Sequence, residues 1–73
     1  MPRTYFYVVP VHNGWALRGG AFAGRNLYDS RDQALLEARR MAMGLFSVSQ
    51  RPTGVRVQLG VEMWEDIELF GDA

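Results

Sequence analysis

The sequence pattern in the middle of this chain predicts one helix. A single helix can cover only one face of a sheet. Ser30 and Gln33 form a capping box, in which the serine oxygen accepts a hydrogen bond from the Gln33 backbone N–H. Apolar residues then recur on one helical stripe, at Ala34, Ala38, Met41, Ala42 and Leu45, with Leu35 at its margin. The pattern predicts a helix that begins after Ser30 and ends near Gly44, where glycine supplies a left-handed cap.

The segment before the helix predicts a β-hairpin. Residues 5–11, YFYVVPV, are β-branched and aromatic, as strands favour. Asn13 and Gly14 tolerate positive φ and predict a two-residue turn, after which WALR returns as the second strand. Alternate positions of the two strands then divide between two faces. This turn would pair Val9 with Arg18. Phe6, Val8, Trp15 and Leu17 are then expected under the helix, and Tyr5, Tyr7, Val9 and Arg18 on the opposite face. A one-residue change of register would exchange the two faces and put Tyr5 and Tyr7 in the core.

The remaining segments predict one more strand before the helix and two after it. A short edge strand is expected around Leu27. VRVQL alternates and WEDIELF follows it as the last strand, with Val55, Val57 and Leu59 inward and Arg56 and Gln58 outward. The predicted fold is a single small α+β domain over residues 1–73. It is expected to be an antiparallel sheet of four to five strands with one helix packed on one face, in the order ββ(β)αββ.

Charge is balanced overall but unevenly distributed along the chain. There are eight basic residues, all of them arginine and all before Val57, against eight acidic ones, so the net charge is zero. From Val61 onward the chain holds five of the acids and no base. Arginine suits phosphate and carboxylate recognition, but net neutrality differs from the basic footprint usual for nucleic-acid binders. We expect the two ends of the chain to neutralise each other in the fold.

The composition also bears on the compartment. The sequence has no cysteine, which excludes disulfides and thiolate metal sites and fits a reducing interior such as the bacterial cytosol. Charges interrupt every window long enough to span a membrane. The start, MPRTYF, lacks the apolar segment of a signal peptide. We therefore expect a cytoplasmic protein without a membrane partner.

The candidate catalytic residues lack the neighbours that their chemistry needs. His12 is the only histidine, and without a carboxylate nearby in the hairpin it is expected to be a solvated loop residue. The segment 19–24, GGAFAG, lacks the lysine and the helix of a phosphate loop, and its glycines are expected to form turns or bulges. On the last strand the period of two puts Glu65 on one face and Asp66 and Glu68 on the other. We expect no enzyme activity, no metal and no cofactor.

Two surfaces are candidates for binding. The sheet face away from the helix is expected to collect Tyr5, Tyr7, Val9, Arg18 and Arg56. Such a face could bury itself against a second copy or another protein. Alternatively, together with Arg25, it could stack the bases of single-stranded nucleic acid. The second surface is a ridge on the helix, either a docking site or ordinary exposed surface, formed by Leu36, Arg39, Arg40 and Met43. We expect a self-associating binding or adaptor module, with nucleic-acid binding as the alternative.

An ordered set of motifs carries a family resemblance. YVVP, NGWAL, YDSRDQALLEARRMA, VRVQ and ELFGD together resemble domain-of-unknown-function family 2188, a family of small bacterial proteins. The resemblance covers residues 5–72, and the matching positions are Val9, Pro10, Trp15, Asp29, Ala34, Ala38, Arg39 and Gly71. The segment LGVEMWE departs from the D-G turn that the family usually has before its last strand. Because the family has no established activity, the resemblance implies a fold and a bacterial source without adding chemistry.

Overall fold

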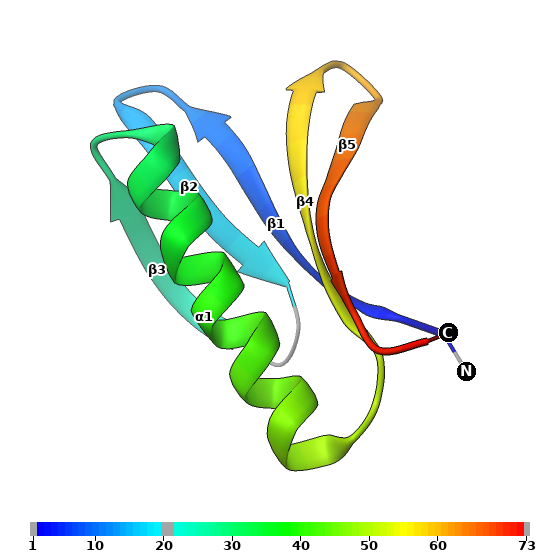
Figure 1. The fold of residues 1–73 in the computed structure, drawn as a ribbon. Coiled ribbons are helices and arrows are strands. Elements are labelled where there is room, and N and C mark those ends of the chain that lie inside the picture. The colour runs from blue at the N-terminus through cyan, green and yellow to red at the C-terminus, as the bar shows by residue number, and fades with distance from the viewer. Residues whose placement is uncertain (1, 20–21, 73) are drawn as a thin grey trace.

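One helix packs on one face of a five-stranded sheet. The computed structural model describes residues 2–19 and 22–72, and for residues 22–26 it describes the backbone. The elements in chain order are β1 (Thr4–Val11), β2 (Gly14–Gly19), β3 (Phe22–Tyr28), α1 (Arg31–Ser49), β4 (Thr53–Gly60) and β5 (Met63–Phe70). The strands lie in the order β3-β2-β1-β4-β5, with α1 across one face (Figure 1). The predicted α+β class, single helix and edge strand around Leu27 are confirmed.

The sheet is mixed, so the prediction of an antiparallel sheet is wrong. β1 pairs with β4 in parallel, while the other neighbouring strands are antiparallel. The reason is the third strand: β1, β2 and β3 form a meander, so β3 runs in the same direction as β1. α1 then carries the chain back along the sheet face, and β4 starts again in the direction of β1 (Figure 1).

The core lies between α1 and the sheet face that it covers, here called the inner face. Ala34, Ala38 and Ala42 are fully buried, and their small side chains let the helix lie close to the strands. The sheet contributes Phe6, Val8, Leu17, Val55 and Val57. Trp15, Leu35, Met41 and Leu45 pack around this centre. The predicted helix stripe and the predicted inner-face residues other than Leu59 are therefore confirmed.

Leu59 was expected in the core and is not there. Its side chain is 53% exposed. The pairing of β4 with β5 shifts between Gln58 and Gly60, so the alternation that buries Val55 and Val57 stops before Leu59. An interrupted ladder at the end of a hairpin therefore overrides the sequence pattern.

The loop of the first hairpin lies one residue earlier than predicted. Val11 pairs with Gly14, so the two loop residues are His12 and Asn13. Gly14 begins β2 with a φ of +145°, and the carbonyl oxygen of Tyr28 on β3 lies where a Cβ would stand. Both the positive φ and the approach of a third strand therefore require glycine at this position.

The change of pairing leaves the two faces of the hairpin as predicted. Arg18 pairs with Tyr7 instead of Val9, and Val9 pairs with Ala16. Each residue of β2 pairs with a residue of β1 that lies two positions earlier than predicted. Because side chains alternate along a strand, a shift by an even number keeps every side chain on its face. Tyr5, Tyr7, Val9 and Arg18 therefore still lie opposite the buried residues of β1 and β2.

α1 continues past Gly44, where the sequence predicts its end, and stops at Ser49. Gln50 adopts the left-handed conformation (φ 60°), and its backbone N–H donates to the carbonyl oxygen of Phe46 at 2.8 Å. Pro52 follows soon after, as is common beyond a helix end. Gln50 therefore provides the cap expected of glycine, and Gly44 lies within the helix.

Replacing Gly44 with alanine is expected to stabilise the protein by about 0.5–1 kcal/mol, because the unfolded chain loses entropy. Outside the helix backbone, no described atom lies within 4 Å of a Cβ built there. In a domain of this size, 1 kcal/mol raises Tm by about 4–8 °C, which thermal unfolding at matched concentration measures. A lower Tm for Gly44→Ala would contradict a position without steric demands.

Arginines from the first part of the chain pair with carboxylates of β5. Nε of Arg39 on α1 lies 2.6 Å from Glu68, and Nε of Arg56 on β4 lies 2.6 Å from Asp66. The expectation that the basic and acidic parts of the chain neutralise each other is confirmed at these two places.

Candidate functional site

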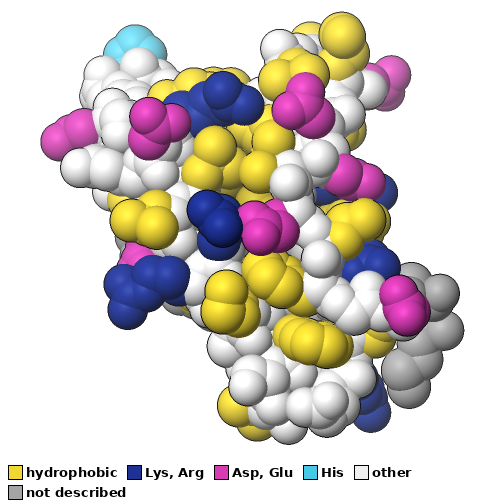
Figure 2. Space-filling view, viewed as in Figure 1, with side chains coloured by type: hydrophobic (Ala, Val, Ile, Leu, Met, Phe, Trp, Pro, Cys, Tyr) yellow, Lys and Arg dark blue, Asp and Glu magenta, His cyan; other side chains and the backbone are white. Residues whose placement is uncertain are grey.

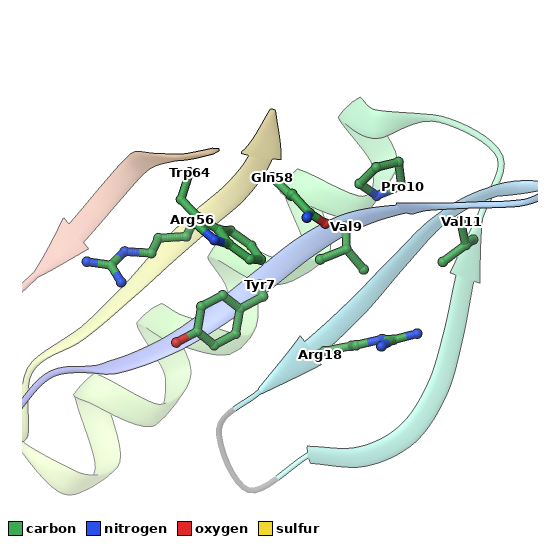
Figure 3. Close-up of a pocket in the computed structure, with 8 residues that line it drawn as sticks. All are labelled: Tyr7, Val9, Pro10, Val11, Arg18, Arg56, Gln58 and Trp64. Atoms are coloured by element: carbon green, nitrogen blue, oxygen red, sulfur yellow. The ribbon is translucent and has the colours of Figure 1, made fainter. Parts of the chain in front are cut away.

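The sheet face opposite α1, here called the outer face, brings together the side chains that the sequence singled out. Tyr5, Tyr7 and Val9 lie on β1, Arg18 on β2 and Arg56 on β4. Figure 3 shows the last four of these on one side of the sheet, with α1 behind it. The side chain of Arg25, which the nucleic-acid hypothesis added to this set, lies outside the described part of the structure.

Aromatic rings and one guanidinium form a packed cluster on the outer face. Cζ of Arg56 lies 3.6 Å from the centroid of the Tyr5 ring, a cation–π contact. Tyr7 meets Trp64 edge to face, with centroids 5.2 Å apart and planes at 71°, and its centroid lies 6.1 Å from that of Tyr5. Aromatic pairs of this kind contribute about 0.5–1.5 kcal/mol each beyond burial. The cluster is therefore held in shape by its own contacts.

Asp66 neutralises Arg56 within this cluster. Nε of Arg56 donates to Oδ1 of Asp66 at 2.6 Å. This hydrogen bond raises the pKa of Arg56 above its ordinary value, against the opposing effect of burial. Arg18 differs, because among the described residues no carboxylate lies within 4.0 Å of its guanidinium. Among the described residues near this cluster, Arg18 therefore carries an uncompensated positive charge, as does Arg3, whose side chain lies beside Tyr5 at Gly54 and donates only to carbonyl oxygens.

A hollow of about 620 Å³ opens on the outer face. Its lining residues are Tyr7, Val9, Pro10, Val11, Arg18, Arg56, Gln58 and Trp64. Figure 3 shows Val9 and Val11 along β1, with Arg18 to one side and Trp64 to the other. An apolar surface flanked by a ring and a cation suits a flat or apolar group that carries a negative charge beside it.

The predicted division of the β5 carboxylates is wrong. Asp66 and Glu68 were expected on one face, but the pairing of β4 with β5 shifts between Val55 and Arg56. The extra residue puts Asp66 outward beside Arg56, whereas Glu68 pairs with Val55 and reaches Arg39 on α1. The bulge therefore allows each carboxylate to pair with a different arginine.

Trp64 and Asp66 are site residues that the sequence-based selection missed. Both lie on β5, and Trp64 pairs with Gln58, which was expected to face outward with Arg56. A signal was available: Trp64 and Asp66 are two positions apart, with Glu65 between them, so alternation puts them on one face. Which face that is depends on the pairing of β5 with β4, and the sequence does not reveal this pairing.

The predicted ridge on α1 consists of separated apolar side chains. Leu36 and Met43 are 59% and 50% exposed. Arg39 and Arg40 are engaged in ion pairs within the chain, at 2.6 and 3.4 Å. On the side of the molecule in Figure 2, charged side chains interrupt the hydrophobic ones. The ridge therefore offers less continuous apolar surface than the outer face.

The remaining candidate positions are His12 and the segment 19–24. His12 is exposed in the loop between β1 and β2. In the segment 19–24, Gly19 ends β2 next to a bulge between Leu17 and Gly19, and residues 22–24 belong to β3. Residues 20 and 21 lie outside the described part of the chain. Within residues 2–19 and 22–72, no group of three or more His, Cys, Asp or Glu side chains could hold a metal ion. The helix found in that range is not long and apolar enough to cross a membrane.

The outer face thus combines an aromatic cluster, a neutralised arginine, an arginine without an ion pair among the described residues, and an apolar hollow. The carboxylate of Asp66 on this face accepts a hydrogen bond from Arg56. The resemblance to domain-of-unknown-function family 2188 stays a prediction. Comparisons with protein-family models, with curated proteins and with solved structures found no match for this chain.

Proposed function

We propose that this protein is a small binding module that assembles with a second copy of itself through the outer face. The observation that carries the proposal is the aromatic cluster of Tyr5, Tyr7 and Trp64 on the face opposite α1, with Trp64 43% exposed. Apolar patches of this kind usually mark interfaces. Tryptophan, tyrosine and arginine are also the residue types that contribute most to interface energies.

The charge of the chain supports self-association. Because the net charge is zero, two copies approach without long-range repulsion. The paired carboxylates Asp66 and Glu68 are held by arginines and serve the fold, which supports a binding role rather than acid–base catalysis. We place the module in the bacterial cytosol, on the grounds of a cysteine-free sequence and the resemblance to family 2188.

Single-stranded nucleic acid is the second ligand that the outer face could take. Arg18 supports it, because a cation that lacks an ion pair among the described residues stands near the rings of Tyr7 and Trp64. Two observations weigh against nucleic acid as the ligand: Asp66 already neutralises Arg56, and the net charge of the protein is zero. Self-association is therefore the function we favour.

Sedimentation equilibrium tests the proposal. From about 1 µM to several hundred µM, the range of weak to moderate protein association, the average mass should rise from 8.3 kDa towards twice that value. A parallel titration with single-stranded RNA, single-stranded DNA and duplex at low salt should show no binding. A mass of 8.3 kDa at every concentration would contradict self-association, and salt-sensitive binding of a single strand by that monomer would favour the alternative.

A further inference from the structure

A row of four outward residues crosses the middle strands of the sheet. Arg18 on β2 pairs with Tyr7 on β1, Tyr7 pairs with Arg56 on β4, and Arg56 pairs with Asp66 on β5. From β2 to β5 the row therefore reads cation, ring, cation, carboxylate. When a second copy of the row is laid over the first in reverse order, every position has a favourable partner. A carboxylate meets a cation at the two outer positions, and a cation meets a ring at the two inner positions.

We infer that two copies pack outer face against outer face about a two-fold axis that runs along the strands, between β1 and β4. This inference rests on the proposed function and specifies its geometry. The rotation lays β5 of the partner over β2, and β4 of the partner over β1. Arg18 then meets the partner's Asp66, and Tyr7 meets the partner's Arg56. Each contact occurs twice, as an isologous interface requires.

The arrangement supplies Arg18 with a carboxylate. Its own chain offers none within 4.0 Å among the described residues. Arg56 donates to Oδ1 of Asp66, and the side chain of Asp66 remains 42% exposed, so Oδ2 can accept from a second guanidinium. Two arginines on one carboxylate leave no buried acid unpaired, which is the condition for a charged pair in an interface.

The next outward positions fit by size. Two residues further along, Ala16 pairs with Val9 on one side of the axis, and Gln58 pairs with Trp64 on the other. The rotation lays the partner's Trp64 over Ala16, whose small side chain is 6% exposed, and next to Val9, which is 9% exposed. The hollow beside Val9 adds room for the ring. Stacked sheets pack about 10 Å apart with strands at about −30°, so the axis follows the strands only approximately.

The other two-fold arrangement of the same faces is unfavourable. An axis in the plane of the sheet but across the strands lays every strand over its own copy. Arg18 would then face Arg18 of the second copy, and Asp66 would face Asp66. Like charges placed opposite each other oppose association. The order of charges in the row therefore selects the axis along the strands.

Two charge-reversal variants test this geometry when they are mixed. Arg18→Glu sets two carboxylates opposite each other at both symmetric contacts, and Asp66→Lys sets two cations there. Each variant alone should dimerise with a Kd at least about tenfold above that of the unaltered protein. In a heterodimer of the two variants, the introduced carboxylate meets the introduced ammonium group at one contact, and Arg18 meets Asp66 at the other. An equimolar mixture should therefore regain close to the original affinity.

The matched control is Arg51→Glu, which reverses an exposed arginine away from the outer face and should leave the Kd unchanged. Circular dichroism checks that each variant folds. If a second cation beside Arg56 prevents Asp66→Lys from folding, Asp66→Asn takes its place. Mixing Arg18→Glu with Asp66→Asn should still tighten binding relative to Arg18→Glu alone. The proposed axis is overturned if neither variant changes the Kd of the dimer, or if mixing the two variants does not restore the affinity. Either result leaves the outer-face proposal standing. A strictly monomeric unaltered protein overturns the proposed function itself.

Discussion

The substitution Leu17→Ala is expected to lower the free energy of unfolding by about 3 kcal/mol. Leu17 is 1% exposed and is among the largest fully buried side chains. It lies on the inner face with Val8 and Val57, beneath the alanine stripe of α1. A close-packed interior cannot refill the cavity left by three lost carbon atoms. Since small domains are stable by about 5–15 kcal/mol, the variant should still fold but unfold at a clearly lower urea concentration.

Urea unfolding followed by tryptophan fluorescence measures this change, because Trp15 packs against the core. Both proteins must be compared at one concentration, since dimerisation adds to apparent stability. The control is Leu36→Ala, the same substitution at a 59% exposed site on α1, which should cost less than about 0.5 kcal/mol. Equal losses for the two variants would contradict the assignment of Leu17 to the core.

The substitution Trp64→Ala should have the opposite pattern, with a large effect on association and a small one on the fold. The ring is 43% exposed and contacts Tyr7 edge to face, so its removal opens no core cavity. Because the ring is an interface hot spot that occurs twice in a dimer, its removal should raise the Kd by about 30-fold or more. Sedimentation of the variant and of the unaltered protein over one concentration range measures the ratio.

Met43→Ala is the control for Trp64→Ala, because Met43 is 50% exposed on the opposite side of the molecule. Its Kd should match that of the unaltered protein. If Met43→Ala weakened the dimer and Trp64→Ala did not, the interface would lie on the helix ridge with Leu36 instead of the outer face.

Local patterns predict much of this fold. The alanine stripe of α1 and the inward residues Val55 and Val57 follow from helical and strand periodicity and are found as expected. Of the capping box, the bond from the Gln33 backbone N–H to Ser30 is found. The outward position of Tyr7 survives even though the hairpin loop moved, because an even shift preserves faces. Periodicity is a local property, so it holds whatever the strand order.

The features that sequence reasoning missed depend on contacts between distant segments. The parallel pairing of Tyr7 with Arg56 follows from where α1 returns the chain, and no local pattern encodes it. The bulge opposite Val55 decides that Asp66 faces outward. Trp64 and Asp66 therefore join the candidate site only once β5 is paired with β4. The row that makes the outer face self-complementary is likewise a product of three separate pairings.

Isotope-filtered NOE spectroscopy on a mixed labelled and unlabelled sample tests most directly whether the outer face is an interface between two copies. At concentrations where sedimentation gives the dimer mass, intermolecular NOEs should join the Trp64 ring of one protomer to the Ala16 methyl group of its partner. Leu36 and Met43 on α1 should give none. Intermolecular NOEs confined to these helix methyls, or none at the outer face of a proven dimer, would contradict the account.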